Sequence, residues 1–271
     1  MSLTGTLILR AKAKHDRTIL SDCYYDGALK MSRPVYLEDG HPIFYLIHVG
    51  GGYVGGDLYN TRIVLDEKAE ISLTTQSATK IYKTTKEPAR QETEIRLKRD
   101  SFLSLVQDPL ILYQDSQFVQ TTTVYLEQGA SFLMTDILTP GWAESGELFT
   151  YDWIRSKLAM YYEGRLVLLD HLYLKPAEQI ESMMMMEGYT HFGSMLFVHE
   201  ETTETFINQI QELLDGYDEE ARIGISTLAI KGFILRVLAR HTQVIEEIFT
   251  RCETYIREKA LQKRAVCYRK Y

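Results

Sequence analysis

A glycine-rich segment, residues 48–57, comes closest in residue types and spacing to a known chemistry. Gly50, Gly52 and Gly55 satisfy the GxGxxG spacing with which dinucleotide-binding proteins hold a pyrophosphate. That mechanism needs a helix to begin near Gly55, whereas residues 59–66 alternate in polarity as a strand does. We therefore predict that Gly55 and Gly56 serve a tight β connection with positive φ, and that no cofactor binds here.

Nucleophilic and phosphoryl-transfer chemistry finds little support in the rest of the chain. The polar segment 74–80 carries Ser and Thr hydroxyls and ends in Lys80, but it lacks the glycines of a phosphate loop. No nucleophile elbow occurs, and the seven histidines never follow the spacings that build a local metal site. The sequence thus predicts no catalytic residue. The alternative that stays open is a β-sandwich hydrolase whose Ser, His and acid converge from distant positions.

Two further groups of side chains could hold a metal ion. Carboxylates at turns line polar channels or hold hard cations transiently, although they more commonly cap the turn itself. The sulfurs of residues 183–186, all methionine, are soft ligands, yet methionine more commonly fills irregular core space. The acidic residues in question are Asp57, Asp108, Asp136 and Glu147.

The elements that must position these residues are mainly strands. From residue 3 to about residue 174, short runs alternate in polarity between turn residues, which predicts about a dozen strands with no helices between them. Without helices the strands cannot form a doubly wound parallel sheet. The fold class is therefore mainly β, with many short strands in a coiled β (β-helix-like) or sandwich architecture, or in a barrel.

Helical spacing occurs only near the C-terminus. Two apolar stripes predict helices, the first ending near Gly216, and between them residues 222–229 are predicted as a strand and the chain from about Gly232 onward as helical. These elements form a small C-terminal α+β portion, about residues 190–265, on a β body of about residues 1–175. We expect one domain over residues 1–271. The stripes consist of Phe206, Ile207, Ile210, Leu213 and Leu214, and of Val244, Ile245, Ile248, Phe249, Cys252 and Ile256.

The amino-acid composition limits the classes of partner and the cellular compartment that we expect. A net charge of -7 disfavours general attraction to nucleic acid or anionic lipid, and the basic run 251–271 is typical of a solvated helix face followed by a tail. No segment reaches the roughly 18 apolar residues of a membrane span, and no export signal is recognisable. The three cysteines, Cys23, Cys252 and Cys267, fit reduced thiols. A cytoplasmic protein is expected.

Three segments together resemble the urease accessory protein family UreD, also called UreH. They are Gly51-Gly-Tyr-Val-Gly-Gly-Asp57, Leu73-Thr-Thr-Gln-Ser-Ala-Thr-Lys-Ile-Tyr-Lys83 and Gly141-Trp-Ala-Glu-Ser-Gly-Glu-Leu-Phe149. Their order and spacing match as well, and the likeness extends from Arg33-Pro34 through Asp108-Pro109 to about Asp170.

The resemblance implies a non-catalytic scaffold in nickel insertion. Its partners would be a second urease accessory protein of the UreF type, a nickel-carrying GTPase of the UreG type and apo-urease, with a dimer of such hetero-complexes as one arrangement. No tightly bound cofactor is implied, only transient nickel. Because nickel lies high in the affinity order of divalent metals, a delivery protein should hold it weakly. Asp57 and Glu147 are then the candidates for residues of a polar passage or an interface.

Overall fold

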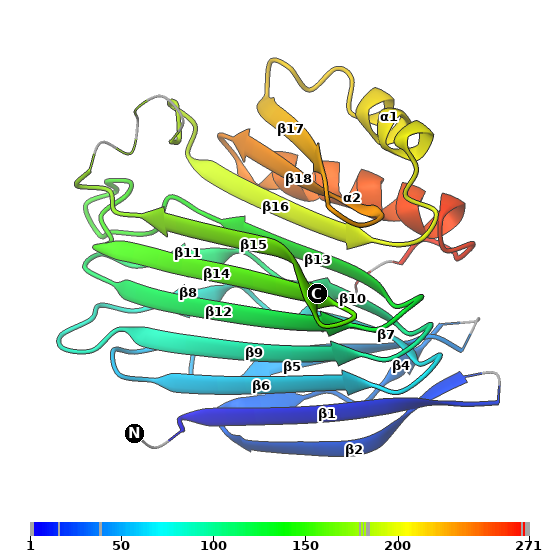
Figure 1. Ribbon diagram of the computed structural model, residues 1–271. Coiled ribbons are helices and arrows are strands. Elements are labelled where there is room, and N and C mark those ends of the chain that lie inside the picture. Colours follow the sequence, from blue (N-terminus) through cyan, green and yellow to red (C-terminus); the bar gives the residue numbers. More distant parts are fainter. Residues whose placement is uncertain are drawn as a thin grey trace.

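The computed structural model of the chain describes residues 3–15, 17–37, 40–178, 180, 182, 185–266 and 268. Two β-sheets face one another, and two helices lie on one side of the stack (Figure 1). Sheet 1 runs in the spatial order β15 (Arg165–Leu174), β14 (Trp153–Tyr162), β12 (Gln117–Leu126), β9 (Ala89–Leu97), β6 (Leu58–Leu65), β1 (Gly5–Lys14) and β2 (Arg17–Gly27).

Sheet 2 is the larger sheet. Its main path runs β17 (Ala221–Thr227), β18 (Gly232–Ala239), β16 (His191–Val198), β13 (Ser131–Leu138), β10 (Phe102–Val106), β7 (Glu70–Thr75), β5 (Pro42–His48) and β3 (Leu29–Met31). The short strands β4 (Val35–Tyr36), β8 (Thr79–Ile81) and β11 (Leu110–Leu112) pair at its margin. Because β16, β17 and β18 continue the path from β13, the C-terminal strands share a sheet with the β body.

The chain advances as a coil. It alternates between the sheets from β5 to β14, and each pass lays a strand parallel to the preceding one in the same sheet. Crossovers therefore run through the opposite sheet instead of through helices, which is how parallel strands form without βαβ units. This confirms the predicted mainly β fold of the coiled, β-helix-like type.

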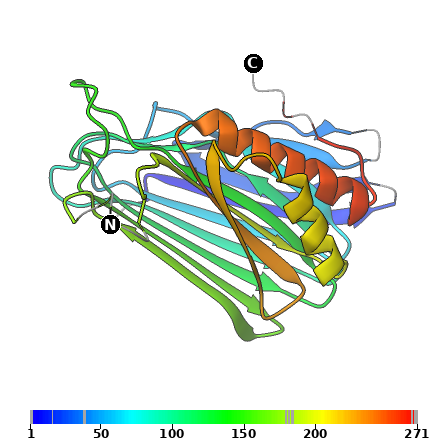
Figure 2. The ribbon, with the colours of Figure 1, turned by 90° about the horizontal axis from the view of Figure 1, so that it is seen from above.

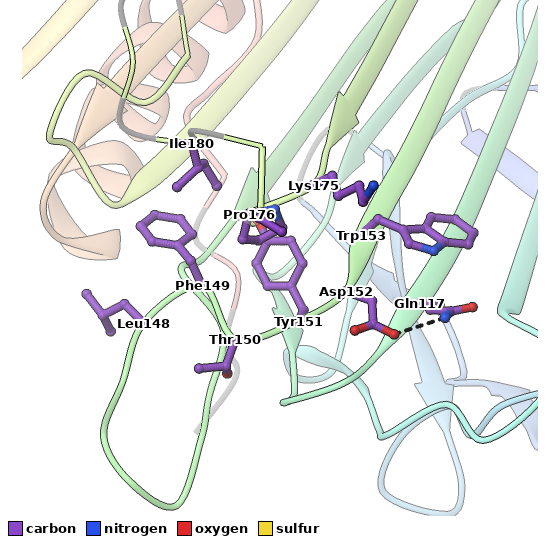
Figure 3. A pocket seen from close by; sticks show the side chains of 11 residues that line it. Gln117, Leu148, Phe149, Thr150, Tyr151, Asp152, Trp153, Lys175, Pro176 and Ile180 are labelled. Atoms are coloured by element: carbon purple, nitrogen blue, oxygen red, sulfur yellow. Dashed lines mark hydrogen bonds between the residues drawn. The ribbon is translucent and has the colours of Figure 1, made fainter.

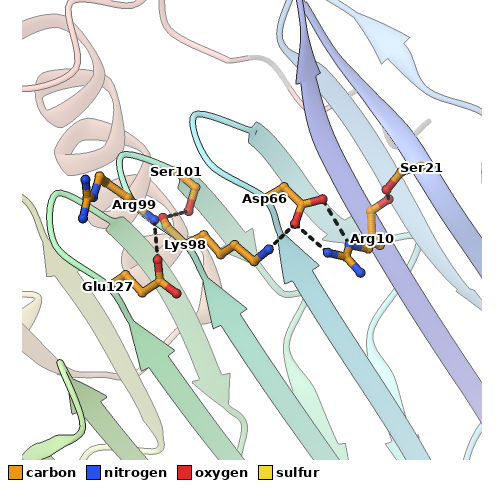
Figure 4. Close-up of polar contacts among 7 residues, drawn as sticks. All are labelled: Arg10, Ser21, Asp66, Lys98, Arg99, Ser101 and Glu127. Carbon is orange, nitrogen blue, oxygen red and sulfur yellow. Dashed lines mark hydrogen bonds and ion pairs between the residues drawn. The ribbon is translucent and has the colours of Figure 1, made fainter.

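Charged side chains tie successive turns of the coil together at one end (Figure 4). Arg10 on β1 donates from Nη2 and Nε to the two carboxylate oxygens of Asp66, at 2.8 and 3.1 Å. Lys98, one turn further along, lies 2.8 Å from the same carboxylate. Hydrogen bonds from Arg10 and Lys98 lower the pKa of Asp66 to about 2. One turn on, the Arg99 amide donates to Glu127 Oε2 at 3.0 Å.

Both helices cover the face of sheet 2 that points away from sheet 1 (Figure 2). α1 is Glu204–Leu213, and its N-cap residue is Thr203, whose side chain accepts a hydrogen bond from the Phe206 amide. α2 is Thr242–Lys259. The apolar stripes of both predicted helices include the side chains that they bury against the sheet. Gly193 on β16 permits this contact, since a Cβ there would lie 2.5 Å from Ile245 Cγ2 of α2.

Two expectations about the C-terminal portion are corrected. Residues 232–239 form strand β18, although the chain from about Gly232 onward was expected to be helical. The strand lies between β16 and β17, with sheet 1 residues on one face and helix residues on the other, so its apolar run lacks alternation. The basic run is also not wholly solvated, because Arg257 is 1% exposed. Cys267, Arg269 and Lys270, like Met183 and Met184, lie outside the described residues.

Candidate functional site

A layer of polar side chains crosses the interior between the two sheets. Gln91 on β9, Gln120 on β12 and Ser156 on β14 are register partners on adjacent strands. Thr93 and Thr122 form the next inward level. Apolar core lies on both sides of these levels, with Ile95 and Val124 in one cluster and Ala89 and Phe118 in another. Buried polar groups are costly unless they are hydrogen-bonded, so this layer is a candidate for function.

Sheet 2 contributes a carboxylate to the layer. Asp136 on β13 accepts a hydrogen bond at Oδ2 from Gln120 Nε2, at 3.2 Å. Burial raises the pKa of Asp136 to about 6, more than the bonds to Gln120 and to the backbone of Ile137 lower it. A small cavity of about 50 Å³ adjoins the carboxylate and is also lined by Thr122, Ser156 and Ser194. We call Gln91, Thr93, Gln120, Thr122, Asp136 and Ser156 the polar layer.

Larger cavities lie near the two ends of the polar layer. One, of about 460 Å³, opens between β15 and the strands β17 and β18, and it shares Asp170, Leu172 and Phe192 with the Asp136 cavity. Arg236 and Asp170 form an ion pair at this junction. At the opposite end, a cavity of about 370 Å³ includes Gln91. The register partner of Gln91 is Gln120, which lines the Asp136 cavity, so the polar layer connects the walls of all three spaces.

Asp57 sits at the turn that precedes β6, with its carboxylate fully engaged. It accepts from the Thr4 hydroxyl at 3.0 Å, from the Val54 amide at 2.8 Å and from the Tyr59 hydroxyl at 3.0 Å. Burial, together with this neighbouring carboxylate, raises the pKa of Tyr59. Tyr59 also meets His48, whose Nε2 lies 2.9 Å from the hydroxyl. Asp57 therefore helps to position the buried Tyr59 and, through it, the half-buried His48 beside the polar layer.

Glu147 lies apart from Asp57, on an exposed loop. Its side chain accepts from the Ser145 hydroxyl at 3.2 Å. The cavities that the described residues line do not bring Asp57 and Glu147 together. Asp108 accepts from the Thr75 hydroxyl at 2.8 Å, and its own amide donates back to that hydroxyl. Of the four acidic residues predicted at turns, Asp136 instead lies within strand β13, and it alone of the four has its carboxylate between the sheets.

An open groove of about 860 Å³ lies beside the Glu147 loop (Figure 3). Phe149, Tyr151 and Trp153 line one part of it, and Lys175 and Pro176 line another. The hydroxyls of Thr150 and Tyr151 are buried and have no hydrogen-bond partner within the described part of the chain. Leu148 at the groove is 52% exposed, as is Trp142 on the same loop. Such an exposed apolar rim is typical of a protein-binding surface.

The structure contradicts the dinucleotide interpretation of the glycine-rich segment. Strand β6 begins at Leu58, so no helix follows Gly55. Gly56 has the predicted positive φ, at +87°, but Gly55 does not. At Gly55 the constraint is close approach, since a Cβ would lie 3.1 Å from the Glu87 carbonyl oxygen and 3.3 Å from Thr84 Cα. Gly50, Gly51 and Gly52 carry the other positive φ angles of the segment.

A hydrolase would need a Ser, a His and an acid in one cleft. His41 Nε2 lies 2.8 Å from Ser72 Oγ, and His41 Nδ1 lies 3.9 Å from Glu70. Ser72 has no exposed surface, however, and its hydroxyl also accepts from Arg257 Nη2 of α2 at 2.8 Å. None of the cavities above is lined by Ser72 or His41, and both side chains are buried.

Among the residues that the structure describes, no group of three or more His, Cys, Asp and Glu side chains is placed to hold a metal ion. The same residues form no helix that is both long and apolar enough to cross a membrane.

Comparison with known proteins gives one consistent result. The family model described as "UreD urease accessory protein" matches residues 3–270. A protein of Bacillus sp. (strain TB-90) named "Urease accessory protein UreD" is 49% identical over 271 residues, which is 100% of each chain. Proteins of the same name are 42% identical in Lachnoclostridium phytofermentans and 38% identical in Staphylococcus aureus (strain bovine RF122 / ET3-1), each covering 99% of this chain and 98% of the relative.

Proposed function

The chain belongs to the UreD family of urease accessory proteins, and from this premise we propose that it is a non-catalytic scaffold for urease maturation. It docks a second accessory protein of the UreF type and a nickel-carrying GTPase of the UreG type onto apo-urease, and it assists the insertion of nickel. The GTPase supplies the energy and the release step. This chain positions its partners relative to one another, and its interior provides a passage that binds nickel weakly.

The observation that carries the passage is the polar layer with its single carboxylate. A delivery protein needs oxygen ligands sparse enough to release nickel, because a closed site of three or four good ligands would trap it. Amide and hydroxyl groups surround Asp136, and the other carboxylate that lines its cavity, Asp170, is paired with Arg236. With a pKa of about 6, Asp136 ionises near neutral pH and can then attract a divalent cation. The cavity of about 460 Å³, which shares Asp170 with the Asp136 cavity, provides a candidate end for the passage.

Asp57 and Glu147 take different parts in this proposal. Asp57 holds Tyr59 and, through it, His48 beside the polar layer, so it shapes the passage more than it binds the ion. Glu147 stands in solvent near the exposed Trp142 and Leu148, where a partner protein can reach it. We therefore assign Asp57 to the passage wall and Glu147 to a docking surface.

The test uses cells that make urease and the other accessory proteins but lack this chain. Urease from these cells should be inactive and poor in nickel, and supplying the chain should restore both. A tagged chain should also retain the second accessory protein, the GTPase and apo-urease in a pull-down. Active, nickel-loaded urease in cells without the chain, or a tagged chain that retains none of these partners, would contradict the proposal.

A further inference from the structure

The cavity of about 370 Å³ at the far end of the polar layer has a distinct chemistry. Two segments that the sequence singles out meet there, residues 51–53 of the glycine-rich segment and residues 77–80 of the polar segment. Lys30 on β3 also lines this cavity. The passage proposed above uses Gln91 and His48 from this cavity, and it gives no role to Lys30, Lys80 or the groups of residues 51–52 and 77–79.

Two lysines line the cavity without a counter-charge. Neither Lys30 nor Lys80 has a carboxylate within ion-pair distance in the part of the chain that the structure describes. The Lys30 ammonium lies 5.0 Å from the centroid of the Tyr25 ring. By contrast, Lys83, Lys98 and Lys263 each lie within 3 Å of a carboxylate. Two cations on one concave surface repel one another, so this cavity favours an anion and disfavours a metal cation.

The nearby carboxylates do not neutralise this pair. The Asp57 carboxylate accepts hydrogen bonds from three donors, and the Asp108 carboxylate accepts one from the Thr75 hydroxyl. Neither Asp57 nor Asp108 is among the cavity-lining residues.

Hydrogen-bond donors accompany the two lysines. The amides of Gly51, Gly52 and Ser77 donate to no protein acceptor among the described residues, nor do the hydroxyls of Ser77 and Thr79. Gly51 and Gly52, with φ of +81° and +156°, both line the cavity. A side chain at position 52 is excluded, because its Cβ would lie 2.6 Å from the Lys80 carbonyl oxygen. Position 52 therefore requires glycine.

We propose that this cavity binds a small oxyanion. The lysines Lys30 and Lys80 supply charge, and the Gly51 and Gly52 amides with the Ser77 and Thr79 hydroxyls supply directed donors, the combination that proteins use for phosphate and carboxylate groups. The volume is ample for one such group with ordered water. The inference does not depend on the nickel passage, since it concerns the opposite charge at a different cavity.

Titration calorimetry of the purified full-length chain tests the proposal with two probes, inorganic phosphate and acetate, at constant ionic strength set by sodium chloride. At least one probe should bind saturably, and Lys80→Met should weaken that binding ten-fold or more. Lys83→Met is the matched control, because Lys83 is nearby in sequence, pairs with Asp115 and lies outside the cavity. The control should bind as the wild type does.

A second variant covers the case in which Lys80→Met fails to fold. Ser77 is exposed and makes no contact that the fold depends on, so Ser77→Ala should fold and should bind the same probe several-fold more weakly. The relative affinity for phosphate and acetate then identifies the class of oxyanion. Absence of saturable binding by both probes, or equal binding by the wild type, Lys80→Met and Ser77→Ala, would overturn the proposal.

Discussion

At the level of single residues, Asp136 belongs to the polar layer, and burial of its charged carboxylate lowers the stability of the fold. Its pKa is raised to about 6 because burial penalises the charged form. A carboxyl group of this kind stabilises the fold fully at a pH below its unfolded pKa of about 4. The contribution is lost as the pH rises through 6, because ionisation is then more favourable in the unfolded chain.

Asp136→Asn should therefore stabilise the protein at neutral pH. Asn keeps an oxygen that can accept from Gln120, and its amide can donate to the serine hydroxyls of the cavity. The expected gain in the free energy of unfolding is roughly 2 kcal/mol at pH 7.5, falling to near zero at pH 4. Denaturant unfolding at the two pH values measures it. If Asp136→Asn lowers the free energy of unfolding by the same amount at both pH values, burial does not penalise the charged form of the carboxylate.

The glycines of residues 51–56 should differ in their tolerance of alanine. At Gly52 a methyl group would collide with the Lys80 carbonyl oxygen and with the Tyr82 ring, so Gly52→Ala should cost roughly 2–4 kcal/mol. Gly56 has φ of +87° but no atom within 4 Å of an added Cβ, and Gly56→Ala should cost only about 1 kcal/mol of backbone strain. Thermal unfolding of both variants gives the order, and a reversed order would mean that strain outweighs the collision.

Local patterns predict a residue's turn or strand but not its partner across the coil. Asp57 is recognisable as the end of a glycine turn, and the structure finds it there. The prominence of Asp136 among the acidic residues depends on Gln120, which lies 16 positions earlier and in the other sheet. No spacing rule connects the two. Because every inward position of the coil alternates alike, the polar layer emerges only once the register between strands is known.

At the scale of elements, a buried charge pair anchors α2 to sheet 2. Arg257 Nε lies 3.2 Å from Glu253 Oε1, and Arg257 Nη2 donates to the Ser72 hydroxyl at 2.8 Å. Tyr268 adds a hydrogen bond from the C-terminal segment to the same Glu253 oxygen, at 2.8 Å. These contacts hold the helix and the segment after it on one face of the sheet.

Removal of one partner should therefore destabilise the protein more than removal of both. Glu253→Met leaves the Arg257 guanidinium buried without its carboxylate, which should cost about 3–5 kcal/mol. The double variant Glu253→Met and Arg257→Met replaces the pair by apolar side chains of similar length and should recover most of that loss. Denaturant unfolding measures both. If the double variant is as unstable as the single one, hydrogen bonds to Ser72 and Tyr268 matter more than the charge pair.

The elements themselves divide by how they are buried. Strands with one buried face, such as β12, alternate strictly and are predictable, and so are α1 and α2 with their apolar stripes. Residues 232–235 of β18 are buried on both faces, so this apolar run resembles a buried helix, which explains the wrong prediction from Gly232 onward. A coiled architecture was predicted only as one choice among several, because turns of unequal length leave no fixed period in the sequence.

At the level of the whole molecule, several large apolar side chains are exposed. Trp142 and Leu148 on one loop and Leu169 on β15 are each more than half exposed. We therefore expect poor solubility when the chain is made alone and better solubility on co-expression with the second accessory protein. Size-exclusion chromatography with light scattering at increasing concentration checks this. A chain that stays monomeric at high concentration without partners would show that its docking surface is smaller or more polar.

The nickel content of urease shows whether the chain assists nickel insertion through its interior. Urease is purified from cells that carry the wild-type chain, Asp136→Asn, or the control Asp115→Asn, whose carboxylate is exposed and paired with Lys83. With the accessory complex intact in each pull-down, Asp136→Asn should lower the nickel bound per urease active site at least five-fold, and Asp115→Asn should leave it unchanged. Full nickel occupancy of urease from the Asp136→Asn cells would contradict the passage.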